Sequence, residues 1–122
     1  MPQDSPNGTC TLGGYPAYAV NVSNVAQIQL AIKFASNTNI RLVIKNTGHC
    51  YLGKSSGAGS LSIWLHNLKN ITFLPEYQSG NYSGKALKIG AGVTLRELYQ
   101  AAHTHGVSVL GGICEVIPLQ PT

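Results

Sequence analysis

The sequence predicts an α+β fold, in which a strand–helix–strand unit is followed by further short strands and one more helix. Hydrophobic residues make up 43% of the 122 residues and charged residues only 10%, with 14 glycines. This composition is typical of a globular, glycine-rich chain rather than a disordered one. Short β-branched stretches also alternate with segments whose apolar residues recur at helical spacing. A chain of this length has room for one domain with its own core.

The first half of the chain contains the strand–helix–strand unit. Residues 18–22 form a short strand, and Ser23 or Asn24 caps a helix that ends at residues 37–39. Residues 40–45, rich in β-branched and apolar side chains, form the second strand. Two strands joined by a helix are most simply parallel, and such units bind ligands at the carboxyl ends of their strands. We therefore expect the functional residues in the segment after the second strand.

Three short strands are predicted in the middle of the chain. Residues 61–65 alternate like a strand, residues 71–74 are apolar and β-branched, and residues 86–89 form the third. The polar residues 75–85 contain two glycines and are predicted to be an exposed turn.

A second helix and a final strand complete the predicted elements. The glycine-containing turn at residues 90–92 leads into a helix that begins with a capping box, Thr94 with Glu97 three residues later. Leucines and alanines at helical spacing give this helix a buried face. Residues 107–110 are predicted to form the last strand, which leads into two glycines and Cys114.

The segment after the second strand is the candidate ligand-binding loop. Residues 46–59 contain four glycines, two serines and a lysine. Glycine tolerates positive φ and adds no side-chain bulk, so backbone N–H groups in such a loop can approach and bind a phosphate. The loop matches neither the Walker pattern nor the Rossmann fingerprint. From these residues alone, an anion-binding loop and a plain surface loop stay equally open.

Charge and cysteine spacing argue against several classes of function. The net charge is +4, but the eight Lys and Arg residues are scattered, with no run typical of a nucleic-acid-binding tail. A modest positive field suits a small anionic ligand, and an ordinary solvated surface explains it as well. No segment approaches the ~18 apolar residues of a membrane span. The three cysteines, Cys10, Cys50 and Cys114, lack the spacing of a zinc site, and no metal and no specific protein partner are predicted.

Four Asn-x-Ser/Thr sequons begin at Asn7, Asn21, Asn70 and Asn81. They favour relatives that pass through the secretory pathway. Chance is the alternative explanation in a chain rich in Asn, Ser and Thr. The first ten residues are polar and contain no apolar segment typical of a signal peptide, so the sequence gives no localisation for the chain itself.

A specific resemblance emerges at residues 41–49 (RLVIKNTGH), 53–59 (GKSSGAG) and 61–64 (LSIW). These stretches resemble the flavin-phosphate loop of fungal FAD-linked oxidoreductases, the berberine-bridge-enzyme-like family with a vanillyl-alcohol-oxidase (VAO) or PCMH-type FAD-binding domain. Residues 15–18 and 89–92 resemble flanking landmarks of the same family. Within it, the chain most resembles the ergot-alkaloid chanoclavine synthase type.

The resemblance implies FAD as the cofactor and an incomplete PCMH-type FAD-binding domain. It divides the chain into a leader segment at residues 1–14, the partial domain at 15–114 and an aberrant tail at 115–122. The implied cofactor-binding residues are Asn46, Thr47, Gly48, His49, Gly53, Lys54, Ser55, Ser56, Gly57, Gly59 and Cys114.

Two of these residues take positions at which family members attach FAD covalently. His49 matches the residue that bonds to the flavin 8α carbon, a role that suits a neutral imidazole nucleophile. Cys114 falls where some members attach a cysteine sulfur to flavin C6, and an ordinary buried cysteine is the equal alternative. Cys50 follows His49 where relatives commonly have an aspartate.

The implied function is that of a truncated, inactive FAD-linked oxidoreductase related to enzymes of secondary-metabolite, alkaloid biosynthesis. After Cys114 the family continues with a second glycine-rich run and a substrate domain that carries the catalytic base, so no catalytic residue is assigned here. The last strand is expected to expose an apolar edge. Two alternatives stay open: a small FAD- or nucleotide-binding module completed by a partner chain, and a non-enzymatic secreted domain held by a Cys10–Cys50 disulfide.

Overall fold

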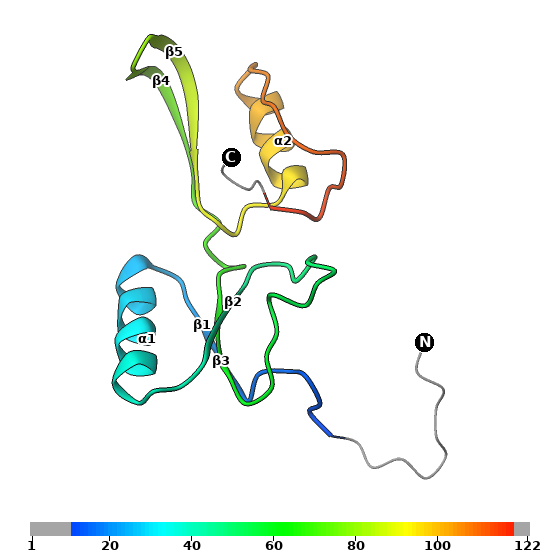
Figure 1. Ribbon diagram of the computed structural model, residues 1–122. Coiled ribbons are helices and arrows are strands. Elements are labelled where there is room, and N and C mark those ends of the chain that lie inside the picture. Colours follow the sequence, from blue (N-terminus) through cyan, green and yellow to red (C-terminus); the bar gives the residue numbers. More distant parts are fainter. Residues whose placement is uncertain (1–10, 119–122) are drawn as a thin grey trace.

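The computed structural model describes residues 11–118, and within them two helices and five strands follow one another in the order β1-α1-β2-β3-β4-β5-α2. Figure 1 shows these elements in two groups. One group is a three-stranded sheet with α1 beside it, and the other is the β4–β5 hairpin with α2 beside it. The predicted α+β fold is confirmed.

The first group is built on a parallel sheet. Strands β1 (Tyr18–Asn21), β2 (Leu42–Lys45) and β3 (Leu61–Trp64) lie in the order β1-β3-β2. The predicted parallel orientation of the first two strands is confirmed, although β3 lies between them and pairs with both. The last residue of β3, Trp64, lies between the last residues of β1 and β2. The carboxyl ends of all three strands therefore meet at one edge, where the predicted ligand-binding loop begins.

Helix α1 (Val25–Asn37) begins where the sequence predicts. The side chain of Asn24 accepts a hydrogen bond from the backbone N–H of Gln27 at 3.0 Å, which satisfies one of the free donors at the helix start. The Thr38 backbone N–H then donates to the carbonyl of Phe34 at the other end.

The buried face of α1 is narrower than its apolar pattern predicts. Ala31 packs with Val22 and Ile63 in the core between helix and sheet. Val25 and Ile32, which continue the helical spacing of apolar residues in this segment, are 66% and 46% exposed. The small side chain of Ala31 lets the helix approach the sheet closely, so larger residues on its flanks stay in solvent.

The second group begins with a hairpin that is longer than predicted. Strand β4 (Ile71–Ser79) pairs antiparallel with β5 (Tyr82–Ile89), so most of the polar stretch predicted as an exposed turn lies inside the strands. The prediction relied on the polar composition of residues 75–85 and on their two glycines, and the stretch also begins with Pro75, a residue type that is uncommon inside strands. Here the register shifts between Leu74 and Tyr77, and the hairpin continues beyond this bulge.

Helix α2 (Leu95–Thr104) packs against the hairpin through a core that contains Val93 and Leu98. The final strand predicted at residues 107–110 is wrong, because this segment is irregular. A strand needs a paired neighbour, and none of the described strands lies along this segment; Leu110 is 96% exposed. No helix in the described part of the chain is long and apolar enough to cross a membrane.

Candidate functional site

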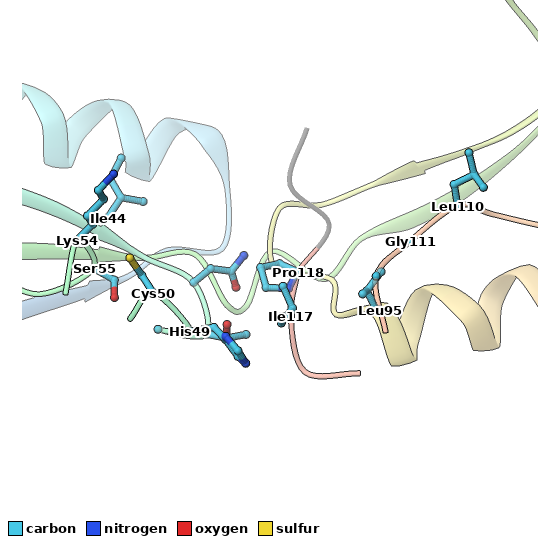
Figure 2. Close-up of a pocket in the computed structure, with 14 residues that line it drawn as sticks. Ile44, His49, Cys50, Lys54, Ser55, Leu95, Leu110, Gly111, Ile117 and Pro118 are labelled. Atoms are coloured by element: carbon cyan, nitrogen blue, oxygen red, sulfur yellow. The ribbon is translucent and has the colours of Figure 1, made fainter. Parts of the chain in front are cut away.

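A pocket of about 1020 Å³ has walls from both groups of elements (Figure 2). One wall is the loop that follows β2, and the other is formed by the start of α2 and by residues 110–118. Six of the predicted cofactor-binding residues line the first wall: Asn46, Thr47, Gly48, His49, Lys54 and Ser55. The pocket thus lies at the carboxyl end of β2, where open parallel sheets bind ligands.

His49 lines this pocket and lies next to Cys114, which is not itself among the lining residues. The Sγ atom of Cys114 is 3.9 Å from Nε2 of His49, within hydrogen-bonding range for sulfur. The two residues are 65 positions apart in the sequence, and both are exposed. The fold therefore brings together the two residues that the family resemblance assigns to flavin attachment.

Four other predicted residues of the loop, Gly53, Ser56, Gly57 and Gly59, do not line the pocket. The N–H groups of Gly53 and Ser56 donate to the carbonyls of Cys50 and Gly53 at 3.2 and 3.0 Å, so both residues shape turns. Gly57 is buried, and a Cβ atom there would lie 3.1 Å from Cγ1 of Val43. Close packing on β2 is sufficient reason for glycine at this position.

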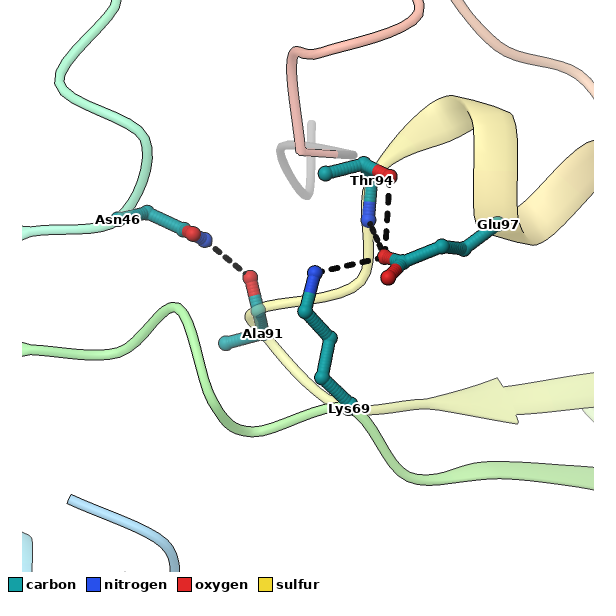
Figure 3. Close-up of polar contacts among 5 residues, drawn as sticks. All are labelled: Asn46, Lys69, Ala91, Thr94 and Glu97. Atoms are coloured by element: carbon teal, nitrogen blue, oxygen red, sulfur yellow. Dashed lines mark hydrogen bonds and ion pairs between the residues drawn. The ribbon is translucent and has the colours of Figure 1, made fainter.

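Asn46 connects the two walls of the pocket (Figure 3). Its side-chain Nδ2 donates a hydrogen bond to the backbone carbonyl of Ala91. Its backbone carbonyl accepts a hydrogen bond from Nε1 of Trp64 at 3.0 Å. The side chain is therefore engaged with protein, and its buried Oδ1 has no partner among the described residues. Asn46 holds the loop against the turn before α2.

That turn approaches the chain after β3 very closely. A Cβ atom on Gly92 would lie 2.3 Å from the carbonyl oxygen of His66, and one on Gly90 would lie 2.2 Å from that of Leu68. The N–H group of Gly92 also donates to the carbonyl of Leu68 at 3.0 Å. Only glycine allows this contact between the two groups of elements.

The start of α2 is held by the predicted capping box, which is confirmed. The carboxylate of Glu97 accepts hydrogen bonds from the backbone N–H and the hydroxyl of Thr94 and from Nζ of Lys69, at 2.7, 2.9 and 2.7 Å (Figure 3). Partial burial raises the pKa of Glu97. The hydrogen bonds from Lys69 and Thr94 and the charge of Lys69 together outweigh this effect, so the pKa lies below its ordinary value. The carboxylate is therefore charged at neutral pH.

The described part of the predicted tail packs on the same helix end. The N–H groups of Leu95 and Arg96 donate to the carbonyls of Ile117 and Glu115 at 3.0 and 3.1 Å. These bonds satisfy helix donors that would otherwise be free to bind an anion. The start of α2 therefore has fewer free donors for an anion, and the loop after β2 remains the predicted phosphate-binding element.

Cys50 is exposed and carries a free thiol beside His49. Hydrogen bonds from the backbone N–H groups of Lys54 and Leu52 lower the pKa of this thiol below its usual range; burial opposes this and the Lys54 charge adds to it. Cys10, its partner in the predicted disulfide, lies outside the described residues.

Residues 16–113 match the family of FAD binding domains. The chain belongs to this family. It is 49% identical over 117 residues to the VAO-type flavoprotein oxidase VAO615 of Thermothelomyces thermophilus, and 44% identical over 119 residues to the bifunctional decalin synthase calF of Penicillium decumbens. These alignments cover 96% and 98% of this chain but only 20% and 21% of the two relatives.

Solved structures show the same fold for this part of the FAD binding domain. The crystal structure of the VAO-type flavoprotein MtVAO615 from Myceliophthora thermophila C1, at pH 5.0, matches with a TM-score of 0.87 at 50% identity, over 89% of this chain and 20% of that one. MtVAO713 from the same fungus gives 0.77 at 41% identity, over 86% and 20%. The predicted resemblance to fungal FAD-linked oxidoreductases is confirmed, FAD is the cofactor of the family, and the chain spans about one fifth of these relatives.

The residues around the pocket fit FAD. Lys54, Thr47 and Ser55 are among the residues of the loop wall, and their side chains carry the cationic and hydroxyl groups that a diphosphate needs as partners. The opposite wall contributes apolar surface from Leu95 and Ile117, suited to an aromatic ring system. Both kinds of contact that a flavin dinucleotide requires are therefore present in one pocket.

The sequence alone missed most of this opposite wall. It consists of Leu95, Leu110, Gly111, Gly112, Ile117 and Pro118. None of these residues belongs to a local binding motif, and Ile117 and Pro118 lie at the pocket where residues 115–117 fold back onto α2. The glycine pair before Cys114 was the one available signal.

Proposed function

We propose that this chain supplies the flavin-holding loop and one apolar wall of the FAD site in a fungal FAD-linked oxidoreductase, and that it has no oxidase activity alone. The contact between His49 and Cys114 carries this proposal, because it joins two residues 65 positions apart at 3.9 Å beside the glycine-rich loop. FAD, when bound, supplies the redox chemistry by accepting electrons from a substrate. The chain's own residues bind and orient it.

The binding roles follow from the chemistry of each side chain. Lys54 balances the diphosphate charge, and Thr47 and Ser55 donate hydrogen bonds to it. His49 and Cys114 hold the flavin ring by the covalent bonds that the family resemblance assigns to them. The Cys50 side chain replaces the aspartate common beside that histidine in relatives, so a polar contact to the ring is absent or altered at this position.

The proposed absence of oxidase activity rests on the titratable side chains of the described pocket. Oxidation of a substrate needs a base to take its proton, which alone is typically worth ~100- to 10,000-fold in rate. The titratable side chains that line the described pocket are His49, Cys50 and Lys54, and two of them are assigned to FAD. The substrate-binding and proton-accepting groups therefore belong to the four-fifths of the relatives' length that the alignments leave uncovered.

The test supplies the purified chain with FAD, oxygen and a panel of alcohol and alkaloid substrates, and follows hydrogen peroxide. We expect no substrate-dependent peroxide. Peroxide that forms with a substrate and disappears in the His49→Ala variant would overturn the proposal. The ergot-alkaloid type within the family stays a prediction that the same panel addresses.

The pocket also supports a second candidate, a small FAD-binding module that a partner chain completes. Its two walls already come from one chain, and its volume suits a large ligand. Flavin absorbance that co-purifies with the soluble chain, and weakens in the Lys54→Ala variant, would favour this module. A colourless chain that FAD does not alter would exclude it.

A further inference from the structure

Three of the four sequons lie in the described part of the chain, and their surroundings differ sharply. Asn21, at the end of β1, uses its side-chain Oδ1 to accept a hydrogen bond from Nδ2 of Asn67 at 2.7 Å. Asn70 is exposed, and its backbone carbonyl accepts a hydrogen bond from the backbone N–H of Gly90 at 2.7 Å. This bond lies at the close contact between the two groups of elements. A glycan on Asn21 would crowd its side-chain hydrogen bond to Asn67, and one on Asn70 would be attached next to the close backbone contact with Gly90.

Asn81 occupies the tip of the β4–β5 hairpin, the free end of the hairpin in Figure 1. Ser79 pairs with Tyr82, so Gly80 and Asn81 form a two-residue turn, and the φ angle of +56° at Gly80 is the conformation that a glycine supplies in such turns. Asn81 and both its neighbours are exposed. Among the described residues its side chain makes no hydrogen bond, so its amide is free.

The rest of the sequon is equally accessible. Ser83, which supplies the required hydroxyl, is exposed on β5. The hydroxyl of Tyr82 donates to the carbonyl of Lys85 at 2.6 Å, which keeps this ring along the strand and away from the tip. No residue of the hairpin tip lines the pocket, so a group attached there leaves the FAD site open.

We propose that Asn81 is an N-glycosylation site, and that the hairpin tip faces solvent in the mature protein. In the transfer, Nδ2 of Asn81 loses a proton and bonds to the anomeric carbon of an oligosaccharide, whose lipid diphosphate carrier leaves. No oxidant or reductant takes part. The proposal concerns a surface away from the pocket and is independent of flavin binding.

The test expresses the full chain behind a cleavable secretion signal in yeast, with the same chain in the yeast cytosol as control. Mass spectrometry of the digested secreted protein should show a glycan on most copies of the Asn81 peptide, and none in the cytosolic protein. Asn81→Gln and Ser83→Ala should each remove this glycan, while Asn70→Gln leaves it in place. An unmodified Asn81 peptide in the secreted chain, or a glycan that survives Ser83→Ala, would overturn the proposal.

Discussion

Replacing Gly92 by alanine should separate the two groups of elements that form the pocket. The new Cβ atom would lie 2.3 Å from the carbonyl oxygen of His66 and 2.5 Å from that of Leu65. Carbon and oxygen atoms that are not bonded rarely approach closer than about 3.3 Å, so the backbone must move by roughly 1 Å. Crowding of this kind costs about 1–3 kcal/mol. Loss of the hydrogen bond from Gly92 to Leu68 adds about 1 kcal/mol.

The total, about 2–4 kcal/mol, is a large share of the ~5–15 kcal/mol by which small domains are stable. Trp64 is the only tryptophan and lies beside this contact, so its fluorescence reports urea unfolding of the affected region. With a slope of about 2 kcal/mol per molar urea, the midpoint should fall by roughly 1–2 M. Gly14→Ala is the matched control, because no heavy atom lies within 4 Å of its new Cβ. A Gly92→Ala chain whose stability stays within about 0.5 kcal/mol of the unchanged chain would refute this account of the contact.

Three further substitutions test the contacts around the pocket. Asn46→Ala removes the hydrogen bond to Ala91 and should lower the unfolding free energy by about 1 kcal/mol, with faster amide exchange in the loop; unchanged exchange would contradict the anchoring role. Glu97→Gln should cost about 0.2–1 kcal/mol at neutral pH. The folded-state pKa of Glu97 lies below its unfolded value, so the stability difference between the two chains should be fully present above the ordinary glutamate pKa. It should vanish as the pH falls through the folded-state pKa. A stability difference that does not change with pH would contradict this role of Glu97. Leu110→Ser combined with Ile113→Ser should change stability by less than about 0.5 kcal/mol while reducing aggregation in light scattering, because these side chains are 96% and 101% exposed; a larger loss would show that they are buried.

Local sequence signals predicted the parts of the fold that local interactions determine. The caps at Asn24 and Thr94 marked the starts of both helices, because a side chain and a backbone group only three residues apart decide them. The strand predictions were wrong where pairing with a neighbouring strand determines the structure. The stretch that begins at Pro75 was predicted as a turn, but the hairpin continues through it past a bulge. Residues 107–110 have strand-like composition without a described strand to pair with.

The two walls of the pocket differ in the same way in how well the sequence predicted them. Part of the loop wall was predictable because Gly48, His49 and Lys54 follow one another closely after β2. The opposite wall depends on the hydrogen bonds of Leu95 and Arg96 to the tail, and no local pattern encodes such a contact. The resemblance to a family named Cys114, but only the folded chain shows it 3.9 Å from His49.

Mass spectrometry of a flavoprotein chimera tests the assignment of this pocket to FAD most directly. Residues 11–118 would replace the matching fifth of VAO615, which is 49% identical in this region. After digestion, we predict a single flavin mass that links the peptide containing His49 to the peptide containing Cys114. In the His49→Ala chimera the flavin should stay on the Cys114 peptide alone. A chimera that retains flavin with neither peptide modified, or with the flavin bonded to another residue, would contradict the assignment.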